Sequence, residues 1–385
     1  MIKRDIEKEL KTLIKEYPVV TIIGPRQSGK TTLAQSLSKK FEYCNLESPE
    51  NRMLATTDPK GFLRQFKSPV ILDEIQRVPE LLSYIQVIVD QKKANGQFIL
   101  TGSHQLKLME SISQSLAGRT AILQLLPLSI HELSNHGIQM DSWADYAING
   151  FFPRIYDQKQ RPQVAYSNYF QTYVEKDVRQ IINLKDLSLF EKFIKLLAGR
   201  VGQIVDYSSL ANDVGVDSKT IKNWISILEV SFIVFRLTPY HHNFGKRVIK
   251  SPKIYFTDIG LLTFLLNIND SAQVLRDPLV GNIFENLVVI DLLKSRLNKG
   301  QISNLYFYRD ENGFEIDLLI DHGRSLTALE VKSAETFNKE QIKNLDKLIK
   351  ISDQVKNRGL IYNGKSGTIN DIRLFNFTEL NKIQT

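Results

Sequence analysis

The chain has 385 residues, 42% of them apolar and 24% charged, which is enough for about two to four domains that each bury a core. Its formal net charge of +8 favours an anionic partner, with nucleic acid the first choice. The single cysteine, Cys44, excludes an internal disulfide, and no apolar run is long enough to span a bilayer. The charged N-terminus lacks the apolar segment of a signal peptide. Together these features predict a cytoplasmic protein without a membrane anchor.

Residues 2–16 carry apolar side chains at helical spacing, and residues 18–23 form an apolar run typical of a buried parallel strand. The run leads into G-P-R-Q-S-G-K-T, after which helical spacing resumes. Glycines at the two ends of such a loop let backbone N–H groups converge on a phosphate at the start of a helix. This context predicts a phosphate-binding loop.

The loop is expected to bind a nucleoside triphosphate, ATP, together with Mg²⁺. Lys30 would reach the β- and γ-phosphates, and the hydroxyl of Thr31 would bind Mg²⁺. The residues expected to contact the nucleotide are Gly24, Pro25, Arg26, Gln27, Ser28, Gly29, Lys30, Thr31 and Thr32.

A second strand signal at residues 69–75 ends in Asp73 and Glu74. Downstream of a phosphate loop, this pair predicts the acidic half of an ATPase site, with Asp73 on the Mg²⁺ and Glu74 polarising the attacking water. The alternative is an ordinary exit from a strand into a loop. A kinase acting on a small molecule is disfavoured, because Glu74 beside Asp73 points to water as the acceptor.

A third strand signal at residues 97–103 ends in Leu-Thr-Gly-Ser. Thr101 or Ser103 is expected to hydrogen-bond phosphate or the attacking water, and the alternative is a strand cap that binds only backbone. Arg119 precedes a further strand at 121–126 and is interpreted either as completing a neighbouring subunit's site in a homo-oligomer or as a surface or salt-bridge residue. The repeated strand and helix signals predict an α/β ATPase core at residues 1–127.

Residues 128–186 are predicted to form a helical lid, and residues 187–257 a winged helix-turn-helix. Its third helix would present Lys219, Lys222 and Asn223 to DNA. Its basic wing, which joins strands at 232–237 and 253–257, would place Lys246, Arg247 and Lys250 on phosphates. The alternative is a structural or protein-binding module.

Residues 258–385 hold a second chemical constellation. Glu285 lies in a predicted helix, Asp317 in a predicted hairpin strand, and Glu330 and Lys332 share one face of the next strand. Asp317 and Glu330 on neighbouring strands are expected to bind Mg²⁺ while Lys332 orients or deprotonates water, which is the chemistry of phosphodiester cleavage. Taken alone, Glu-x-Lys is usually a solvated ion pair.

The chain resembles, over nearly its full length, a prokaryotic family of AAA+-type ATPases with a C-terminal domain of unassigned function. The matching stretches include V-I-L-D-E-I-Q, L-A-G-R, G-F-F-P-R, S-P-K-I-Y-F-T-D-I-G-L and G-N-I-F-E-N. The resemblance implies an AAA+-like P-loop core with a parallel sheet, a winged helix, and a last domain (258–385) similar to the restriction-endonuclease-like PD-(D/E)-x-K superfamily.

Carried over residue by residue, the resemblance implies two sets of site residues. Those matching nucleotide positions are Lys30, Thr31, Asp73, Glu74 and Ser103, and those matching nuclease positions are Glu285, Asp317, Glu330 and Lys332. Ile316 stands where the superfamily's motif has proline. Two functions follow: a Mg²⁺-dependent ATPase that acts on DNA through a nuclease-like domain, or a nucleotide-dependent switch whose C-terminal domain binds DNA or a partner without cleaving.

Overall fold

The computed structural model describes residues 2–37, 40–67, 69–103, 112, 114–174, 187–240 and 249–383. The chain divides into two units. The first comprises Met1–Leu128 with the short segments Val230–Phe232 and Leu297–Gln301, and the second comprises Ser129–Glu229, Ile233–Arg296 and Ile302–Thr385.

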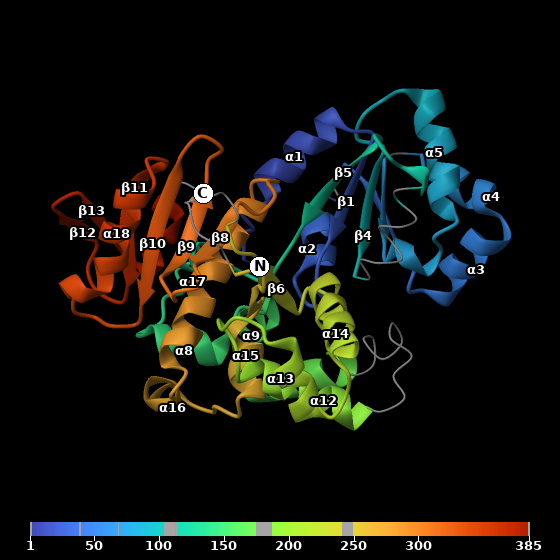
Figure 1. Cartoon of the computed structure of the whole chain (residues 1–385). Helices are drawn as coiled ribbons and strands as arrows, with labels where there is room; N and C mark the ends of the chain where they lie inside the picture. The colour runs from blue at the N-terminus through green and yellow to red at the C-terminus, as the bar shows by residue number, and fades with distance from the viewer. Residues whose placement is uncertain are drawn as a thin grey trace. The chain divides into compact units, whose positions relative to one another are not determined.

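The first unit is built on a parallel sheet (Figure 1). Its strands are β1 (Val19–Ile23), β2 (Glu42–Asn45), β3 (Val70–Asp73), β4 (Phe98–Gly102) and β5 (Thr120–Gln124). The order is β2-β3-β4-β1-β5, and each neighbouring pair runs parallel. Every residue of β1, β3 and β4 is buried, as expected for apolar strands covered on both faces. The predicted α/β core with a parallel sheet is confirmed.

Helices connect these strands and cover the sheet. They are α1 (Glu7–Glu16), α2 (Lys30–Gln35), α3 (Pro49–Thr57), α4 (Pro59–Arg64), the short 3₁₀ helix η1 (Ile75–Arg77) and α5 (Leu81–Lys92). Leu10 of α1 and Leu33 of α2 belong to one buried cluster with Val20 and Ile22 of β1. The two helices therefore pack on β1, and the helical spacing of residues 2–16 reflects that contact.

The strand order decides where the chemical groups of the first unit meet. β1 and β3 both pair with β4, and Leu72 lies opposite Leu100. Since the strands are parallel, their carboxyl ends lie at the same edge of the sheet. The loop after β1, Asp73 at the end of β3 and Thr101 near the end of β4 therefore share that edge.

The second unit begins with helices. They are α7 (Ile130–Asn135), α8 (Trp143–Asn149), α9 (Pro153–Asp157), α10 (Pro162–Tyr169) and the π-helical turn η2 (Phe170–Val174). Asp258 ties this region to the later part of the unit, because its carboxylate accepts hydrogen bonds from the backbone N–H of Phe151 (2.9 Å) and the hydroxyl of Tyr166 (2.6 Å).

Three helices and a two-stranded sheet follow. They are α12 (Leu187–Ala198), α13 (Tyr207–Val214), α14 (Ser218–Val230), β6 (Val234–Leu237) and β7 (Lys253–Phe256). Asp206 caps the start of α13, and Gly215 ends that helix in a left-handed conformation (φ 94°). β6 pairs antiparallel with β7. Lys246 and Arg247, predicted in the connection, lie outside the described residues.

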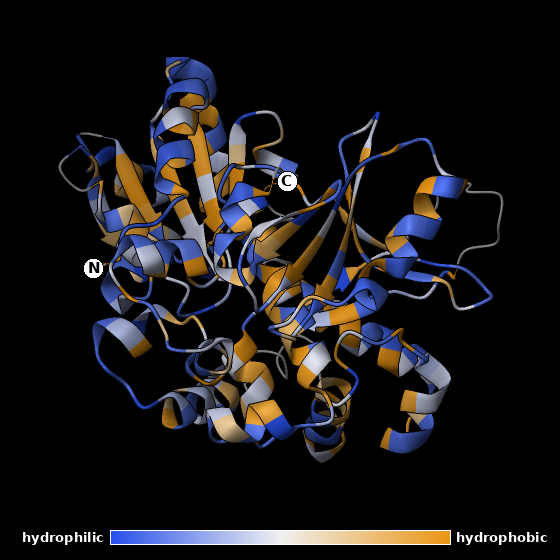
Figure 2. Cartoon of the chain, turned by 90° about the vertical axis from the view of Figure 1, so that its left-hand side faces the viewer, coloured by the Kyte–Doolittle hydropathy of each residue, from blue (hydrophilic) through white to orange (hydrophobic). Residues whose placement is uncertain are grey.

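The last part of the second unit is a mixed sheet in the order β12-β13-β11-β10-β9-β8. Its strands are β8 (Leu305–Arg309), β9 (Glu315–Asp321), β10 (Leu326–Lys332), β11 (Val355–Tyr362), β12 (Gly367–Ile369) and β13 (Ile372–Asn376). β8 and β9 form the predicted hairpin, and β10 runs antiparallel to β9 and parallel to β11. Apolar residues concentrate on the strands of both units (Figure 2).

The remaining elements are helices that follow β7 in the chain, and those that come after β10 pack on strands of the mixed sheet. They are α15 (Ile259–Leu265), α16 (Ser271–Arg276), α17 (Val280–Leu297), α18 (Lys343–Ile351) and the 3₁₀ turns η3 (Lys339–Ile342) and η4 (Phe377–Lys382). Leu345 and Leu348 of α18 pack in one core with Leu319 of β9 and Leu360 of β11. Among the described helices, none has the length and apolar composition needed to cross a bilayer.

Candidate functional site

The loop between β1 and α2 adopts a conformation that depends on its two glycines. Gly24 has φ 155°, and a Cβ atom there would lie 2.1 Å from the carbonyl oxygen of Leu125. Gly29 caps α2 with φ 93°, a left-handed conformation that favours glycine. Ser28 is buried and donates its hydroxyl to the carbonyl of Pro25 (2.9 Å). The loop is therefore tightly folded against the chain after β5.

Lys30, the first residue of α2, turns its amine back into the loop. Its side chain is buried, and Nζ donates to the carbonyl oxygens of Gly24 (2.9 Å) and Pro25 (2.7 Å). Burial lowers the pKa of Lys30 to about 8, against the opposing charges of Glu74 and Asp73. The amine lies where a phosphate held by this loop would be neutralised.

Asp73 is buried and hydrogen-bonded by hydroxyl groups from three neighbouring segments. Its Oδ2 accepts from Thr31 Oγ1 (2.9 Å) and from Tyr43 Oη (2.8 Å), and its Oδ1 accepts from Thr101. Thr31 and Asp73, predicted as Mg²⁺ ligands from 42 residues apart, are thus in contact. A hydroxyl and a carboxylate beside a phosphate loop fit Mg²⁺, which takes few protein ligands and completes its shell with phosphate and water.

Glu74 takes a left-handed backbone conformation (φ 58°). Its Oε2 accepts a hydrogen bond from Ser103 Oγ (3.1 Å) and another from the amide of Gln76. Its backbone N–H donates to Thr101 Oγ1 (3.2 Å). The hydroxyls of Thr101 and Ser103 therefore bind the carboxylates of Asp73 and Glu74. The sequence had predicted either a contact with phosphate or water or a strand cap that binds only backbone, and this arrangement differs from both.

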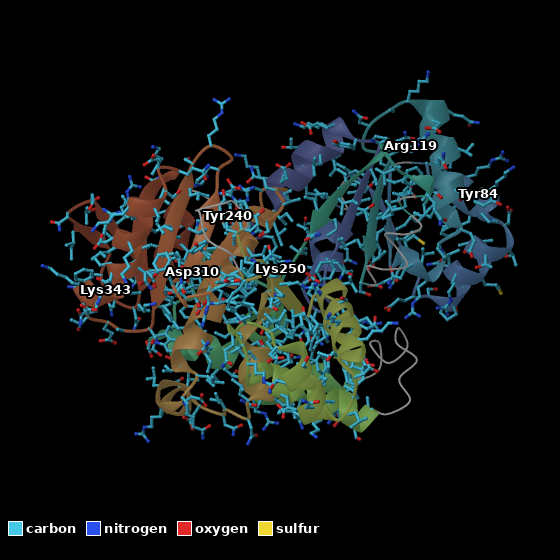
Figure 3. The ribbon with its side chains drawn as sticks, viewed as in Figure 1. Tyr84, Arg119, Tyr240, Lys250, Asp310 and Lys343 are labelled. Carbon is cyan, nitrogen blue, oxygen red and sulfur yellow. The ribbon has the colours of Figure 1, made fainter. Side chains whose placement is uncertain are left out.

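Arg119 is paired within its own unit. Its guanidinium binds Asp90 of α5 with Nε–Oδ1 2.6 Å and Nη2–Oδ2 2.9 Å (Figure 3 labels Arg119). The Arg119 side chain is 33% exposed and that of Asp90 47%. This is the salt-bridge alternative in the isolated chain, and a role for Arg119 in a neighbouring subunit's site stays a prediction.

Three residues of this site were missed at the sequence level. Arg4 is buried, and its guanidinium donates to the carbonyl oxygens of Ser28 (2.7 Å) and Leu126 (2.7 Å). Tyr43 binds Asp73, and Gln76 binds Glu74. No motif marks Arg4 or Tyr43, whereas Gln76 is the last residue of the V-I-L-D-E-I-Q stretch and so had a local signal.

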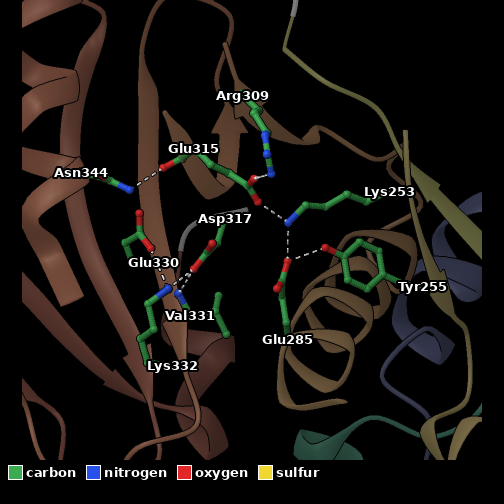
Figure 4. Close-up of polar contacts among 10 residues, drawn as sticks. All are labelled: Lys253, Tyr255, Glu285, Arg309, Glu315, Asp317, Glu330, Val331, Lys332 and Asn344. Carbon is green, nitrogen blue, oxygen red and sulfur yellow. Dashed lines mark hydrogen bonds and ion pairs between the residues drawn. The ribbon is translucent and has the colours of Figure 1, made fainter. Parts of the chain in front are cut away.

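A second cluster lies in the second unit, where β9 and β10 run side by side (Figure 4). Lys332 Nζ contacts Asp317 Oδ2 (2.6 Å) and Glu330 Oε2 (2.8 Å), and the backbone N–H of Val331 donates to Asp317 (2.9 Å). The structure thus brings together the three residues that the sequence predicted on these two strands.

The charges in this cluster are strongly coupled. Burial and the neighbouring charge of Asp317 raise the pKa of Glu330 to about 9, with Lys332 opposing them. Burial also acts to raise the pKa of Asp317, but the ammonium groups of Lys332 and Lys253 outweigh it and lower that pKa. At neutral pH the pair therefore favours a charged Asp317 beside a protonated Glu330.

Glu285 of α17, predicted to join this cluster, is bound mainly by residues that the sequence did not single out. Its Oε1 contacts Lys253 Nζ (3.0 Å) and accepts a hydrogen bond from the hydroxyl of Tyr255. The same Nζ lies 2.7 Å from Glu315 Oε1, whose Oε2 binds Arg309 (2.7 Å). Figure 4 shows Lys253 between the two glutamates.

Mg²⁺ was expected at Asp317 and Glu330, but the arrangement does not fit a divalent cation. Each of the two carboxylates already contacts the Lys332 ammonium, and Glu285 contacts that of Lys253. Within the described ranges, no three His, Cys, Asp or Glu side chains are grouped so that they would hold a metal. The contacts here are those of an internal ion-pair network.

The exposed face of α14 carries the residues predicted to read DNA. Lys219, Lys222 and Asn223 are exposed, and Lys222 Nζ lies 5.2 Å from the ring centre of Tyr207. Lys250, after the connection between β6 and β7, is also exposed. These side chains are therefore accessible, as contacts to phosphate require.

Three protein families match separate stretches of this chain. Residues 16–134 match the AAA domain family. Residues 140–272 and 280–379 each match a domain of unknown function, DUF8612 and DUF4143 respectively. The phosphate loop, Asp73 and Glu74 thus lie in an AAA-type ATPase domain.

A curated relative decides the family. The chain is 30% identical over 339 residues to the uncharacterized protein Rv2008c of Mycobacterium tuberculosis, an alignment that covers 87% of this chain and 74% of that protein. The chain belongs to the family of this mycobacterial protein. A second similar protein, the uncharacterized protein MJ1637 of Methanocaldococcus jannaschii, is 25% identical to this chain over 420 residues, covering 94% of this chain and 86% of that protein.

Two solved structures show a distant likeness. The Walker-type ATPase PABY2304 of Pyrococcus abyssi matches with 14% identity and a TM-score of 0.47, over 69% of this chain and 96% of that one. The RuvB Holliday junction branch migration motor of Thermotoga maritima matches with 19% identity and a TM-score of 0.31, over 60% and 88%. These scores are too low to support an inference. The AAA-type core is confirmed, and the winged helix and nuclease-like domain stay predictions.

Proposed function

We propose that the first unit is a Mg²⁺-dependent ATPase that converts ATP and water into ADP and phosphate. The observation that carries the proposal is the meeting of Lys30, Thr31, Asp73 and Glu74 at one edge of the parallel sheet. Thr31 at the start of α2 and Asp73 at the end of β3 are 42 residues apart in the chain, and the fold brings them into contact. Such an edge is where open α/β sheets bind their ligands.

Each residue has a chemical task in this proposal. The Lys30 amine and the loop N–H groups bind the phosphates, while the Thr31 hydroxyl and the Asp73 carboxylate hold Mg²⁺, which neutralises phosphate charge when bound. Tyr43 and Thr101 fix the orientation of Asp73. The Glu74 carboxylate orients the attacking water and accepts its proton, and its contacts with Ser103 and Gln76 hold it off Asp73.

The test is to measure phosphate release and nucleotide binding separately. Glu74→Gln is expected to bind ATP as the wild type does and to release phosphate at least ~100-fold more slowly, because a carboxamide cannot accept the proton. Lys30→Ala is expected to lose both binding and release, because the phosphates lose their buried cation. A wild-type chain that binds no ATP, or a Glu74→Gln variant with wild-type turnover, would overturn the proposal.

We infer further that the second unit binds DNA through α14. Three exposed polar residues on one helical face, two of them lysines, support this, together with the net charge of +8. ATP binding would then switch this contact in a cytoplasmic homo-oligomer. The alternative role for α14 is a surface for another protein, and a salt-dependent DNA-binding measurement on α14 variants distinguishes the two.

The competing proposal is that ATP hydrolysis drives DNA cleavage by the C-terminal sheet. The convergence of Asp317, Glu330 and Lys332 favours it, whereas the lysine contacts of Glu285 and the absence of a metal-holding group within the described ranges disfavour it. Cutting of DNA by the wild type with Mg²⁺ or Mn²⁺, abolished in Lys332→Ala, would establish this alternative. We favour the hypothesis of a nucleotide-dependent switch whose C-terminal domain does not cleave DNA.

A further inference from the structure

Lys253, at the start of β7, is a buried cation that the ATPase proposal does not use. Its side chain is 4% exposed, and Nζ contacts Glu285 of α17 at 3.0 Å and Glu315 of β9 at 2.7 Å. A buried ammonium is stable only when it is paired and hydrogen-bonded. The two glutamates supply that pairing from two different elements.

The Lys253 contacts continue into the Asp317 cluster. The charge of Asp317 acts on both Lys253 and Glu285, so these groups belong to one electrostatic unit. Lys332 sits between Asp317 and Glu330 on the other side. Figure 4 shows that the ammonium groups of Lys253 and Lys332 contact the carboxylates, and that Arg309 pairs with Glu315.

The position of Lys253 is set by the backbone rather than by a flexible side chain alone. The two ends of the connection between β6 and β7 hydrogen-bond to β8, the edge strand of the C-terminal sheet. Tyr240 N–H donates to Phe307 O (2.8 Å), Phe307 N–H to Thr238 O (3.2 Å), and Ile249 N–H to Arg309 O (3.2 Å).

Side-chain packing strengthens this attachment. Tyr240 is buried in the same core as α18 and the C-terminal strands. Tyr255, which lies on β7 with Lys253, donates its hydroxyl to Glu285. Moving Lys253 out of the cluster would therefore require the β6–β7 pair to leave the sheet edge and would leave the buried Glu285 without its ammonium partner. Both changes are costly.

We propose that the ammonium group of Lys253 takes the place of a divalent cation in this cluster and closes it to Mg²⁺ and Mn²⁺. A metal at Glu285 would have to lie beside the buried ammonium of Lys253, and the repulsion between the two cations disfavours it. The C-terminal sheet then holds its carboxylates without metal and serves as the support for the β6–β7 pair. This inference does not depend on ATP hydrolysis by the first unit.

The first experiment uses the full chain without nucleotide. Mn²⁺ is titrated, and the free ion is followed by its electron paramagnetic resonance signal in the wild type, Asp317→Asn and Asp73→Asn. We expect Asp317→Asn to bind as many Mn²⁺ ions as the wild type. A site that disappears in Asp317→Asn and persists in Asp73→Asn would overturn the inference, because it would place a metal in the cluster despite Lys253.

The second experiment removes the internal cation. Lys253→Met keeps the length of the side chain and is expected to gain one Mn²⁺ site, which the double variant Lys253→Met/Glu285→Gln lacks. Lys250→Met, at an exposed lysine three positions earlier, is the matched control and should gain none. A folded Lys253→Met chain without an added site would contradict the proposal. If Lys253→Met does not fold, the wild-type comparison with Asp317→Asn still decides it.

Discussion

At the scale of residues, the two clusters differ in how their charges are balanced. In the first unit a single buried lysine, Lys30, faces the Asp73 and Glu74 carboxylates, and the carboxylates are held by hydroxyl and amide donors. In the second unit Glu285 and Asp317 contact lysine ammonium groups, and Glu330 is held protonated beside Asp317. The cluster in the first unit can therefore accept a nucleoside triphosphate with its Mg²⁺. The carboxylates in the second unit already have cationic partners and need no metal.

Arg4 is expected to position the phosphate loop. Arg4→Ala removes two charge-assisted hydrogen bonds to buried carbonyls of Ser28 and Leu126, which we expect to lower the free energy of unfolding by about 2 kcal/mol. Because the loop loses its fixed shape, KM for the nucleotide should rise by a larger factor than the factor by which kcat falls, with a several-fold difference between the two. The measurements are chemical denaturation and a steady-state KM and kcat.

The neighbouring exposed Lys3 offers the control for Arg4, since Lys3→Ala removes one charge and none of these contacts. Arg4→Lys keeps the charge and should recover part of the affinity. Equal kinetics for Arg4→Ala and Lys3→Ala would show that Arg4 contributes to stability alone.

At the scale of elements, the sequence predicted helices and strands well where one periodicity ran without interruption. The apolar run before the phosphate loop became β1, and the helical spacing of residues 2–16 became α1, which starts at Glu7. The sequence pattern could not predict which segments pair with one another in space. The two ends of the β6–β7 connection, at 238–240 and at Ile249, hydrogen-bond to β8, and most of the basic wing predicted between them lies outside the described residues.

Helix α14 carries the prediction about DNA. The double variant Lys219→Ala/Lys222→Ala should weaken binding to duplexes of any sequence and reduce the slope of log affinity against log salt by about two, because each lysine releases about one counterion. Fluorescence anisotropy at several salt concentrations measures both quantities.

The matched control for α14 is Lys347→Ala/Lys350→Ala, which has the same spacing and charge loss on the exposed face of α18. If both double variants lose affinity equally, the effect comes from net charge, and α14 is not the binding helix.

At the scale of the whole molecule, assembly is the property that bears most on the proposed ATPase. Arg119 is held by Asp90 in a partly exposed ion pair, and such pairs stabilise a protein only weakly because water screens them. Arg119 can therefore leave Asp90 and bind a phosphate of the nucleotide in a neighbouring subunit at little cost in free energy. The predicted homo-oligomer would use the guanidinium in that way.

Arg119→Ala should lower turnover at least ~10-fold with little change in nucleotide affinity, because the guanidinium acts on the charge that develops during transfer. Mixing it with the Lys30→Ala variant should restore part of the activity, since each subunit supplies what the other lacks. Phosphate release from the mixture, compared with each variant alone, is the measurement. No recovery in a mixture shown to co-assemble would leave Arg119 with only the salt bridge to Asp90.

The sequence by itself determined the features that are local in the chain. The phosphate loop, the Asp73–Glu74 pair and the Glu330-x-Lys332 strand each depend on residues within a few positions, so spacing and residue type suffice to predict them. The burial of the parallel strands followed from their uninterrupted apolar runs.

Tertiary structure alone decided which distant groups meet. Arg4 reaches Ser28 and Leu126 because α1 packs beside β1, and Lys253 reaches Glu285 and Glu315 because the chain around the β6–β7 connection pairs with an edge strand. These contacts join segments 24 to 122 residues apart, and strand order, which no local pattern encodes, determines them.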